Sequence, residues 1–310
     1  MNTNTTNLVS VKELLFIANQ KKIAICAFNV NNMELVQAIT TAADEVNTPI
    51  ILQVTSSAKK YAGSVYIRKL VEAAAASVRI PIALHLDHGD SFETCVDAVE
   101  SGFTSVMIDG SHLPFEENIA VTKKVVDYAH ARGISVEGEL GQISGIEDNV
   151  SSENSHYTDP EKAREFVAAT DVDSLAVSIG TAHGAFKYTG TPKFRFDILA
   201  EIQKAIPNTP LVLHGASSVT QSDVAIINAN GGHIENAIGV SEETLAKAIP
   251  LGVRKINIDS DLRLAFTAAL REYFTNNPSV FDPRSYLAVA RTHVKELVSK
   301  KLRIFSTVNN

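Results

Sequence analysis

Three histidines that lie far apart in the chain are each followed by glycine: His88, His183 and His214. Three imidazole nitrogens with an open fourth position are the ligand set that catalytic zinc often uses. The glycine after each histidine lets backbone and substrate approach closely. A single histidine is more often packed or solvent-facing than ligating, but three in the same local setting favour a metal. We therefore predict that these side chains hold Zn²⁺.

Asp87 directly precedes His88 and is the nearest candidate acid or base. A carboxylate beside a metal can transfer protons during a reaction, or it can orient a ligating histidine. The residues alone leave both roles open. His85 and His112 are also ambiguous. His85 shares a face with Asp87 in an extended segment, where it could serve only to fill the interior.

Two short segments have the composition of phosphate-binding loops. Gly215-Ala216-Ser217-Ser218 offers backbone N–H groups and hydroxyls, and Asn257-Ile258-Asp259-Ser260 places a serine where a helix begins. Helix N-termini and runs of backbone N–H groups attract anions. Each segment alone is equally compatible with an ordinary turn or cap. Lys187, four residues after His183, could add a positive charge or be a solvated lysine.

A long polar stretch over residues 138–154 contains glycine, Glu147 and Asp148. Within it we predict a mobile active-site lid over residues 144–155, which would exclude water when it closes. The alternative is a plain surface loop.

Eight short apolar segments rich in β-branched residues recur along the chain, with helical patterns between them. Strands buried on both faces have this composition. Segments 33–45, 92–101 and 118–131 have helical patterns, and Pro160 after Asp159 marks another helix start. The expected strands are 23–28, 50–54, 82–86, 105–108, 135–139, 174–179, 211–213 and 255–258.

This alternation predicts a single (β/α)8 TIM barrel of the α/β class. An open doubly wound sheet is the alternative, but it often has a glycine-rich loop after its first strand. Here Asn29-Val30-Asn31-Asn32 follows instead. The active site of such a barrel lies where the strands end. Because the histidines and both phosphate loops follow expected strands, the fold would gather them at one mouth.

The composition is that of a soluble globular protein. The 310 residues are 45% hydrophobic and 20% charged, with a net charge of −7. This charge disfavours nucleic acid, and the chain lacks the apolar run of about 20 residues that would predict a membrane span. Cys26 and Cys95 lie in apolar patterns typical of packed thiols in a reducing compartment, so we expect a cytoplasmic protein. We expect one domain over residues 1–310, with a C-terminal helical extension over about 276–310 and a surface excursion at 231–241.

Five motifs together resemble the class II fructose-bisphosphate aldolases, in the branch that includes tagatose-bisphosphate aldolases. The similarity runs from about residue 8 to about residue 305, with the motifs in the family's order and spacing. The motifs are His85-Leu86-Asp87-His88-Gly89, Glu137-Gly138-Glu139-Leu140-Gly141, Gly180-Thr181-Ala182-His183-Gly184, Leu213-His214-Gly215-Ala216-Ser217 and Lys255-Ile256-Asn257-Ile258-Asp259.

The resemblance implies a mechanism. His88, His183 and His214 would hold Zn²⁺, which would stabilise the enediolate of dihydroxyacetone phosphate as a Lewis acid. Asp87 would move the proton of the C4 hydroxyl. Glu147 would handle the proton on the dihydroxyacetone carbon. The products would be dihydroxyacetone phosphate and glyceraldehyde 3-phosphate.

The resemblance also implies substrate contacts and an assembly. A monovalent cation, Na⁺ or K⁺, would lie near the phosphate of the dihydroxyacetone end. Asp109 and Glu139 would offer an alternative, buried metal position. Arg263 would reach the other phosphate, often from a neighbouring subunit, which implies a homodimer or homotetramer. The remaining substrate candidates are Asn29, Thr55, Gly184, Lys187, Gly215, Ser217, Asn257 and Ser260.

Asp259 bears on which sugar is cleaved. Fructose-bisphosphate enzymes of the family tend to have aspartate here, and tagatose-bisphosphate enzymes a small residue. A carboxylate can accept a hydrogen bond from a sugar hydroxyl of one C4 configuration, so fructose 1,6-bisphosphate is favoured over tagatose 1,6-bisphosphate. Two positions depart from the pattern: Thr55 replaces a common serine, and Ile146 stands where some relatives have a second acid.

Two other functions compete with an aldolase. A zinc hydrolase on the same fold usually has a His-x-His pair on its first strand, whereas this first strand ends in asparagines. A non-enzymatic sugar-phosphate binder should have lost a ligand or an acid, and His88, His183, His214, Asp87 and Glu147 are all present.

Overall fold

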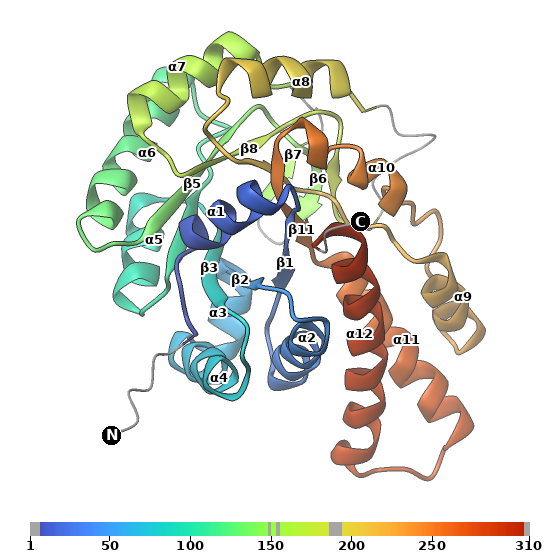
Figure 1. The fold of residues 1–310 in the computed structure, drawn as a ribbon. Helices are drawn as coiled ribbons and strands as arrows, with labels where there is room; N and C mark the ends of the chain where they lie inside the picture. Colours follow the sequence, from blue (N-terminus) through green and yellow to red (C-terminus); the bar gives the residue numbers. More distant parts are fainter. Residues whose placement is uncertain (1–6, 148–149, 153–155, 186–193, 307–310) are drawn as a thin grey trace, which may run out of the picture.

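The computed structural model describes residues 7–147, 150–152, 156–185 and 194–306. Eight parallel strands close into a barrel in the order β1-β11-β10-β8-β5-β4-β3-β2, with helices around it (Figure 1). The predicted (β/α)8 barrel is confirmed. Its strands are β1 (Ile25–Asn29), β2 (Ile50–Thr55), β3 (Ile82–Gly89), β4 (Ser105–Ile108), β5 (Ser135–Leu140), β8 (Ser174–Val177), β10 (Leu211–Leu213) and β11 (Val253–Ile258).

Several helices begin at a residue whose side chain caps them. Asp159 accepts hydrogen bonds from the N–H groups of Glu161 and Lys162 at 2.9 and 3.0 Å, as its position before Pro160 predicts. The helices of the described chain are α1 (Val11–Lys21), α2 (Met33–Val46), α3 (Ser56–Ala62), α4 (Ser64–Ser77), α5 (Phe92–Glu100), α6 (Phe115–His130), α7 (Pro160–Thr170), α8 (Phe196–Ala205), α9 (Gln221–Ala229), α10 (Glu242–Ala246), η1 (Ile249–Leu251), α11 (Ser260–Asn276) and α12 (Pro283–Phe305).

Alternation along each strand separates two cores. On β1, Cys26 and Phe28 face the surrounding helices, whereas Ile25 and Ala27 face the barrel interior and pack against α1. Helix α1 precedes the first strand and closes the amino end of the barrel with four buried apolar side chains: Val11, Leu14, Leu15 and Ala18.

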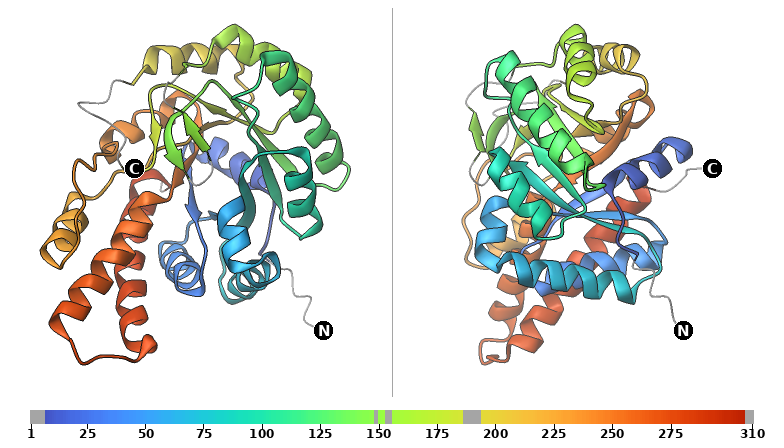
Figure 2. Two further views of the ribbon diagram at one scale, coloured as in Figure 1. Left: turned by 180° about the vertical axis from the view of Figure 1, so that it is seen from behind. Right: turned by 90° about the vertical axis from the view of Figure 1, so that its left-hand side faces the viewer.

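The C-terminal helices α11 and α12 pack side by side and extend together away from the barrel (Figures 1 and 2). The second half of α12 is nevertheless part of the main core, through Val294, Val298, Leu302 and Phe305. The backbone N–H of Ala24 donates to the carbonyl of Phe305 at 2.9 Å. The end of α12 is therefore hydrogen-bonded to the residue that precedes β1.

A small second sheet stands beside the barrel mouth and was not expected from the sequence. It has the order β7-β6-β9, with β6 (Ser144–Glu147), β7 (Val150–Ser152) and β9 (Ala182–His183). Strands β6 and β7 form an antiparallel hairpin within the segment 144–155, over which we predicted a mobile active-site lid. The sheet was not expected because it depends on the pairing of β6 with β9, which are far apart in the sequence, and local sequence patterns do not show such contacts.

Both cysteines are buried free thiols, as predicted, and burial raises the pKa of each to about 12. Within the described part of the chain, the helices are too short or too polar to cross a membrane.

Candidate active site

Strand β3 brings two consecutive side chains, Asp87 and His88, to the inside of the barrel mouth. Consecutive residues of a regular strand face opposite sides. Here His88 has a φ of 50°, in the left-handed region that a non-glycine residue seldom adopts. The pairing of β3 with β4 shifts register between Leu86 and Gly89. This bulge allows both side chains to reach the interior.

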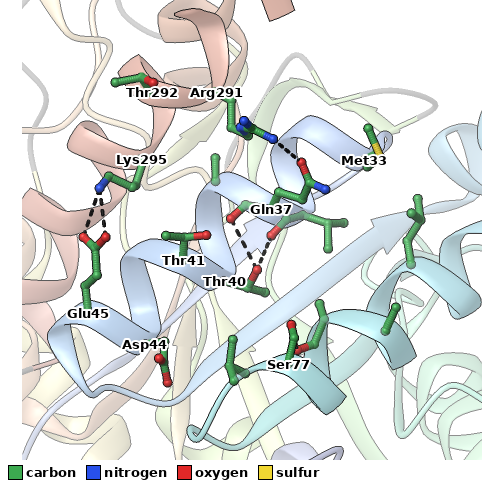
Figure 3. A pocket seen from close by; sticks show the side chains of 16 residues that line it. Met33, Gln37, Thr40, Thr41, Asp44, Glu45, Ser77, Arg291, Thr292 and Lys295 are labelled. Carbon is green, nitrogen blue, oxygen red and sulfur yellow. Dashed lines mark hydrogen bonds and ion pairs between the residues drawn. The ribbon is translucent and has the colours of Figure 1, made fainter. Parts of the chain in front are cut away.

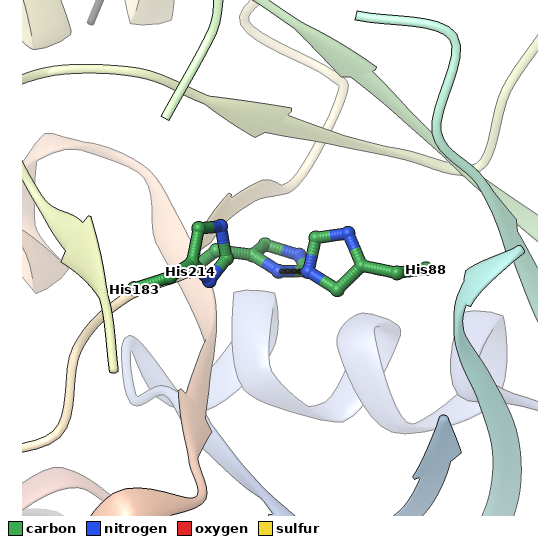
Figure 4. Close-up of side chains that lie close together, drawn as sticks. All are labelled: His88, His183 and His214. Carbon is green, nitrogen blue, oxygen red and sulfur yellow. Dashed lines mark hydrogen bonds between the residues drawn. The ribbon is translucent and has the colours of Figure 1, made fainter. Parts of the chain in front are cut away.

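The three histidines predicted as metal ligands lie together, although they come from β3, from β9 and from the residue after β10. All are buried, and their ligand nitrogens lie within 4.8 Å of one another. Nδ1 of His214 is 3.0 Å from Nε2 of His88. Figure 4 shows the three rings grouped at one point, with His88 on one side and His183 and His214 on the other. This arrangement can hold one ion.

A second possible metal set shares His88 and adds Asp109 and Glu139, the two residues predicted as an alternative position. Nδ1 of His88 is 3.0 Å from Oδ2 of Asp109. Among the described residues, the buried Oε2 atom of Glu139 has no hydrogen-bond partner. A buried carboxylate oxygen in this condition fits a site that a cation can enter.

The electrostatics around His88 favour positive charge. Burial lowers the pKa of His88, but the hydrogen bond to Asp109 and the charge of Asp87 outweigh it and hold that pKa well above its ordinary value. Burial and the charge of Asp109 raise the pKa of Glu139 well above its usual range. Because a ligating imidazole must be deprotonated, a metal ion and a proton compete for His88.

Behind the histidines, a buried charged network fills the barrel. Nε2 of His214 is 2.7 Å from Oε1 of Glu137, and Oε2 of Glu137 accepts from Lys255 Nζ at 2.7 Å. Lys255 Nζ also lies 3.2 Å from Nε2 of His85, whose Nδ1 is 2.9 Å from the Ser105 hydroxyl. His85 therefore belongs to this interior layer and not to the histidine cluster.

The network fixes which ring nitrogen of His214 carries the proton and which one faces His88. Burial raises the pKa of Glu137, but Lys255 and the hydrogen bond with His214 outweigh it and lower that pKa below its usual range. Nε2–H of His214 then donates to a carboxylate, which leaves Nδ1 facing His88. We assigned no role to Lys255 from the sequence. The signal was a lysine on a strand that the barrel buries along its whole length, since a buried lysine needs a partner.

Amide side chains surround the Asp87 carboxylate. Oδ2 accepts from Asn29 at 2.9 Å and from Gln53 at 3.1 Å, and Oδ1 accepts from Asn257 at 3.2 Å. Nδ2 of Asn257 also lies 3.1 Å from Nδ1 of His214. Asn257 therefore links the carboxylate to the histidines, and Asn29 acts on Asp87 through its amide. Gln53 is a further contact that the sequence analysis missed.

The loops after β10 and β11, both of which we predicted to bind phosphate, form one small cup. The Ser217 hydroxyl accepts from the N–H groups of Asp259 at 3.2 Å and Ser260 at 3.1 Å. At Gly215 φ is 61°, and a Cβ atom would lie 2.5 Å from the Ala182 carbonyl oxygen, so the loop needs glycine there. The cup is lined by Gly184, Gly215, Ala216, Ser217, Asn257, Asp259 and Ser260.

Asp259, the N-cap residue of α11, forms an ion pair with Arg263 in the first turn of that helix. Arg263 Nε donates to Oδ1 at 2.8 Å, and a terminal guanidinium nitrogen is 2.6 Å from Oδ2. The Arg263 side chain is half exposed, whereas that of Asp259 is mostly buried. In this chain the arginine therefore lies beside the cup and holds the carboxylate that was predicted to select the sugar.

Four other candidates complete the picture. Thr55 ends β2, pairs in register with Asp87 and caps α3 by accepting from the N–H of Ala58 at 3.2 Å. His112 is exposed in the loop after β4, apart from the histidine cluster. The backbone of Glu147 ends β6, but its side chain lies outside the described structure, and so does Lys187.

A groove of about 870 Å³ lies on the outside of the molecule and not at the mouth. Helices α2, α4 and α12 line it, and the ion pair of Lys295 with Glu45 closes one side (Figure 3). Because these helices surround the barrel, the groove is separate from the histidines inside it. Among the described side chains, it contains no group that could hold a metal ion.

Comparison with known proteins identifies the class to which this fold and site belong. Residues 9–310 match the family described as class II fructose-bisphosphate aldolase. The chain therefore belongs to the class II fructose-bisphosphate aldolase family, whose reaction is that of a carbon–carbon lyase.

Particular relatives are similar over almost their full length. The fructose-bisphosphate aldolase of Treponema pallidum (strain Nichols) is 50% identical, over 95% of this chain and 94% of its own. The fructose-bisphosphate aldolase of Thermus caldophilus is 49% identical, over 97% and 99%. The crystal structure of the YdjI aldolase from Escherichia coli K12 has a TM-score of 0.77 at 31% identity, over 96% of this chain and 97% of that one.

Proposed function

We propose that this chain cleaves fructose 1,6-bisphosphate reversibly into dihydroxyacetone phosphate and glyceraldehyde 3-phosphate, using a Zn²⁺ ion. One observation carries the proposal: His88, His183 and His214 converge beside Asp87 at the mouth of the barrel. The names of the relatives support the same reaction.

The donor set fits zinc. Three imidazoles from separate elements would leave a position open for substrate. His88 would bind through Nε2, because its Nδ1 is engaged by Asp109, and His214 through Nδ1, because its Nε2 is engaged by Glu137. When bound, the ion would supply Lewis-acid stabilisation of negative charge on the substrate. The set of His88, Asp109 and Glu139 would be an alternative position for the metal.

Asp87 would move the proton of the substrate's C4 hydroxyl. The amides of Asn29, Gln53 and Asn257 hold the carboxylate in one orientation, so it need not reorganise when it accepts a proton. In cleavage it would take the hydroxyl proton, and in condensation it would return that proton. This role also makes the neighbouring amides positioning residues for the base.

Glu147 would handle the proton on the dihydroxyacetone carbon. Its strand, β6, pairs with the strand that carries His183, with Gly145 opposite His183. This pairing supports a role for the segment 144–155 as the cover of the site. A cover that excludes water would prevent a misplaced proton from ending the reaction early.

The cup after β10 and β11 would bind the phosphate of the dihydroxyacetone end. Gly215, Ser217 and Ser260 would offer backbone and hydroxyl donors at the N-terminus of α11, where an anion is favoured. Gly184, Asn257 and Lys187 would complete the contacts, with Na⁺ or K⁺ beside the phosphate. Phosphate sites occur after the seventh and eighth strands of many such barrels.

The other end of the substrate would meet Asp259, Arg263 and Thr55. We propose that Asp259 selects the fructose configuration at C4 and that Arg263 contributes to the second phosphate. We also propose a cytoplasmic homodimer or homotetramer, in line with the negative charge and the two reduced thiols.

A coupled cleavage assay on fructose and tagatose bisphosphates, with EDTA and then added zinc, tests the function. We expect cleavage of the fructose substrate that EDTA abolishes and zinc restores. Cleavage that survives complete metal removal would contradict the zinc proposal. Equal cleavage of both sugars would contradict the assignment of the substrate.

Asp259→Ala tests the basis of selectivity. Loss of a charged hydrogen bond to one sugar should reduce the preference for fructose bisphosphate by roughly tenfold or more. The measurement is the ratio of kcat/KM for the two sugars. The control is Asp127→Ala, which removes an exposed carboxylate paired with Lys123 on α6. A ratio that stays constant in Asp259→Ala would remove this residue from substrate selection.

A further inference from the structure

A lysine near the end of the chain is buried behind the proposed phosphate cup. Lys301, on α12, has no exposed surface. Its Nζ lies 2.7 Å from Oδ2 of Asp261, 3.1 Å from the Ser218 hydroxyl and 3.3 Å from Oε1 of Glu242. A fully buried lysine is rare unless its charge is paired. Burial lowers the pKa of Lys301, but the charge of Asp261 outweighs it and the pKa is raised, so the lysine is a cation here.

Asp261 in turn accepts hydrogen bonds from the loop after β10. Its Oδ2 accepts from the N–H of Ser218 at 2.8 Å, and its Oδ1 accepts from the N–H of Val219 at 2.6 Å. Val219 has a φ of 53°, a left-handed conformation that is costly for a β-branched residue. The Asp261 carboxylate therefore holds this part of the loop in a conformation that the chain would otherwise leave.

The segment that Asp261 binds (Ser218 and Val219) directly follows a residue of the cup. Ser217 precedes Ser218, and Ser260 precedes Asp261. The Ser217 hydroxyl also accepts from the N–H of Ser260. The two loops are thus joined on both sides: by Ser217 at the cup and by Asp261 behind it. Any movement of Asp261 would change the spacing of the phosphate donors.

We propose that Lys301 is a positioning residue for substrate phosphate, acting through Asp261 to hold the two loops of the cup and to neutralise the carboxylates behind it. The inference rests on the proposed use of the cup for phosphate. It assigns a role in substrate binding to helix α12, although Lys301 and Ser218 are 83 positions apart in the sequence.

Charge balance is the second part of the argument. Asp261 and Glu242 both lie close to Lys301, and without it two carboxylates would oppose a phosphate dianion nearby. Glu242 has another partner, Lys300, at 2.8 Å, but the Lys300 side chain is mostly exposed (63%) and water screens its charge. Lys301 and Lys300 thus form a matched pair of neighbours, one behind the cup and one on the surface.

The test compares Lys301→Met with Lys300→Met in the zinc-loaded enzyme. Binding of inorganic phosphate is measured by titration calorimetry, together with zinc content, KM and kcat for fructose 1,6-bisphosphate. We expect Lys301→Met to weaken phosphate binding and to raise KM by about tenfold or more, with a much smaller change in kcat and full zinc content. Lys300→Met should stay within about twofold of the wild type.

A double variant separates the role of charge from that of packing. Asp261→Asn/Lys301→Met removes both charges of the buried pair, and such neutral replacements are often tolerated. If neutralisation matters, it should bind phosphate better than Lys301→Met alone but less well than the wild type. It also supplies the test if Lys301→Met does not fold.

The outcomes are distinct from those of the proposed function. Phosphate binding by Lys301→Met within about twofold of Lys300→Met would overturn the inference, even if fructose bisphosphate is cleaved normally. Equal losses of zinc, phosphate and kcat would also overturn it, since they indicate general damage. If the wild type cleaves no bisphosphate but binds phosphate in a Lys301-dependent way, the inference holds and the proposed reaction fails.

Discussion

The two ends of the barrel interior are made by the same strands but from opposite kinds of residue. On β2 the inward positions run from Ile51 to Gln53 and Thr55, and on β3 from Ala83 to His85 and Asp87. At the amino end, α1 covers the apolar residues. At the carboxyl end, the polar residues surround the proposed metal position.

The difference shows how one scaffold serves two purposes. The apolar floor at the amino end, formed by the buried side chains of α1 together with Ile51 and Ala83, is stabilised by burial. The mouth contains buried charges, and these are tolerated where they are paired, as Lys255 is with Glu137. Changes at the mouth should therefore affect chemistry first, and changes at the floor should affect stability first.

Of the changes at the barrel mouth, the removal of one metal ligand should cause the largest loss of activity. We expect His183→Ala to lower kcat/KM by about 10³-fold or more and to abolish zinc retention, because the tripod loses one of its legs. Metal analysis and the cleavage assay measure both effects. His112→Ala, at an exposed histidine after β4, should change neither. Stoichiometric zinc and full activity in His183→Ala would contradict the ligand assignment.

Removing the base should affect chemistry without affecting the metal. Asp87→Asn keeps the size of the side chain but cannot accept the proton, so we expect kcat to fall by about 10²–10⁴-fold with zinc still bound. Steady-state kinetics and metal content measure this. If kcat is unchanged, Asp87 only orients its neighbours; if zinc is lost as well, its role is to support His88.

At the floor the expected effects are reversed. Leu14 on α1 is fully buried, and Leu14→Ala should reduce the free energy of unfolding by about 2–5 kcal/mol. Denaturant unfolding measures this, and kcat/KM should remain within about twofold, because the floor does not contact substrate. Phe16→Ala on the same helix is the control, since Phe16 is exposed. A large loss of kcat/KM in Leu14→Ala would mean that the two ends are coupled.

The sequence predicted the mouth better than its surroundings, for a physical reason. Strand patterns and caps are local, so all eight barrel strands were found within a few residues of their bounds. Because parallel strands of a barrel end at one mouth, residues such as His88 and His214 could be gathered without knowing any contact. Their identity as a group follows from topology alone.

The features that the sequence did not predict depend on contacts between residues that are distant in the chain. The pairing of β6 with β9 is invisible in either segment alone. The left-handed backbone at His88 arises from a register shift between two strands. Lys301 is one of three lysines on α12, and only packing shows that it is buried while Lys300 is mostly exposed.

An ion pair outside the barrel interior, between His293 and Asp223, should have the smallest effect on stability of the changes considered. His293 on α12 lies 2.8 Å from Asp223 on α9. The hydrogen bond with Asp223 raises the pKa of His293 against the opposing effect of burial, and Glu296 and Glu272 also raise it. The pair should therefore contribute its full stability below the unfolded pKa of about 6.5 and lose it as pH rises through the folded value.

His293→Gln should accordingly cost more stability at pH 6 than at pH 9, as measured by urea unfolding at both values. The side chain is 35% exposed, so water screens the pair and the difference should stay below about 1 kcal/mol. His233→Gln, at an exposed loop histidine, is the control and should show no such difference. A cost that grows toward pH 9 would mean that neutral His293 is the stabilising form. A cost of several kcal/mol would mean that this outer pair behaves like the buried pairs of the mouth.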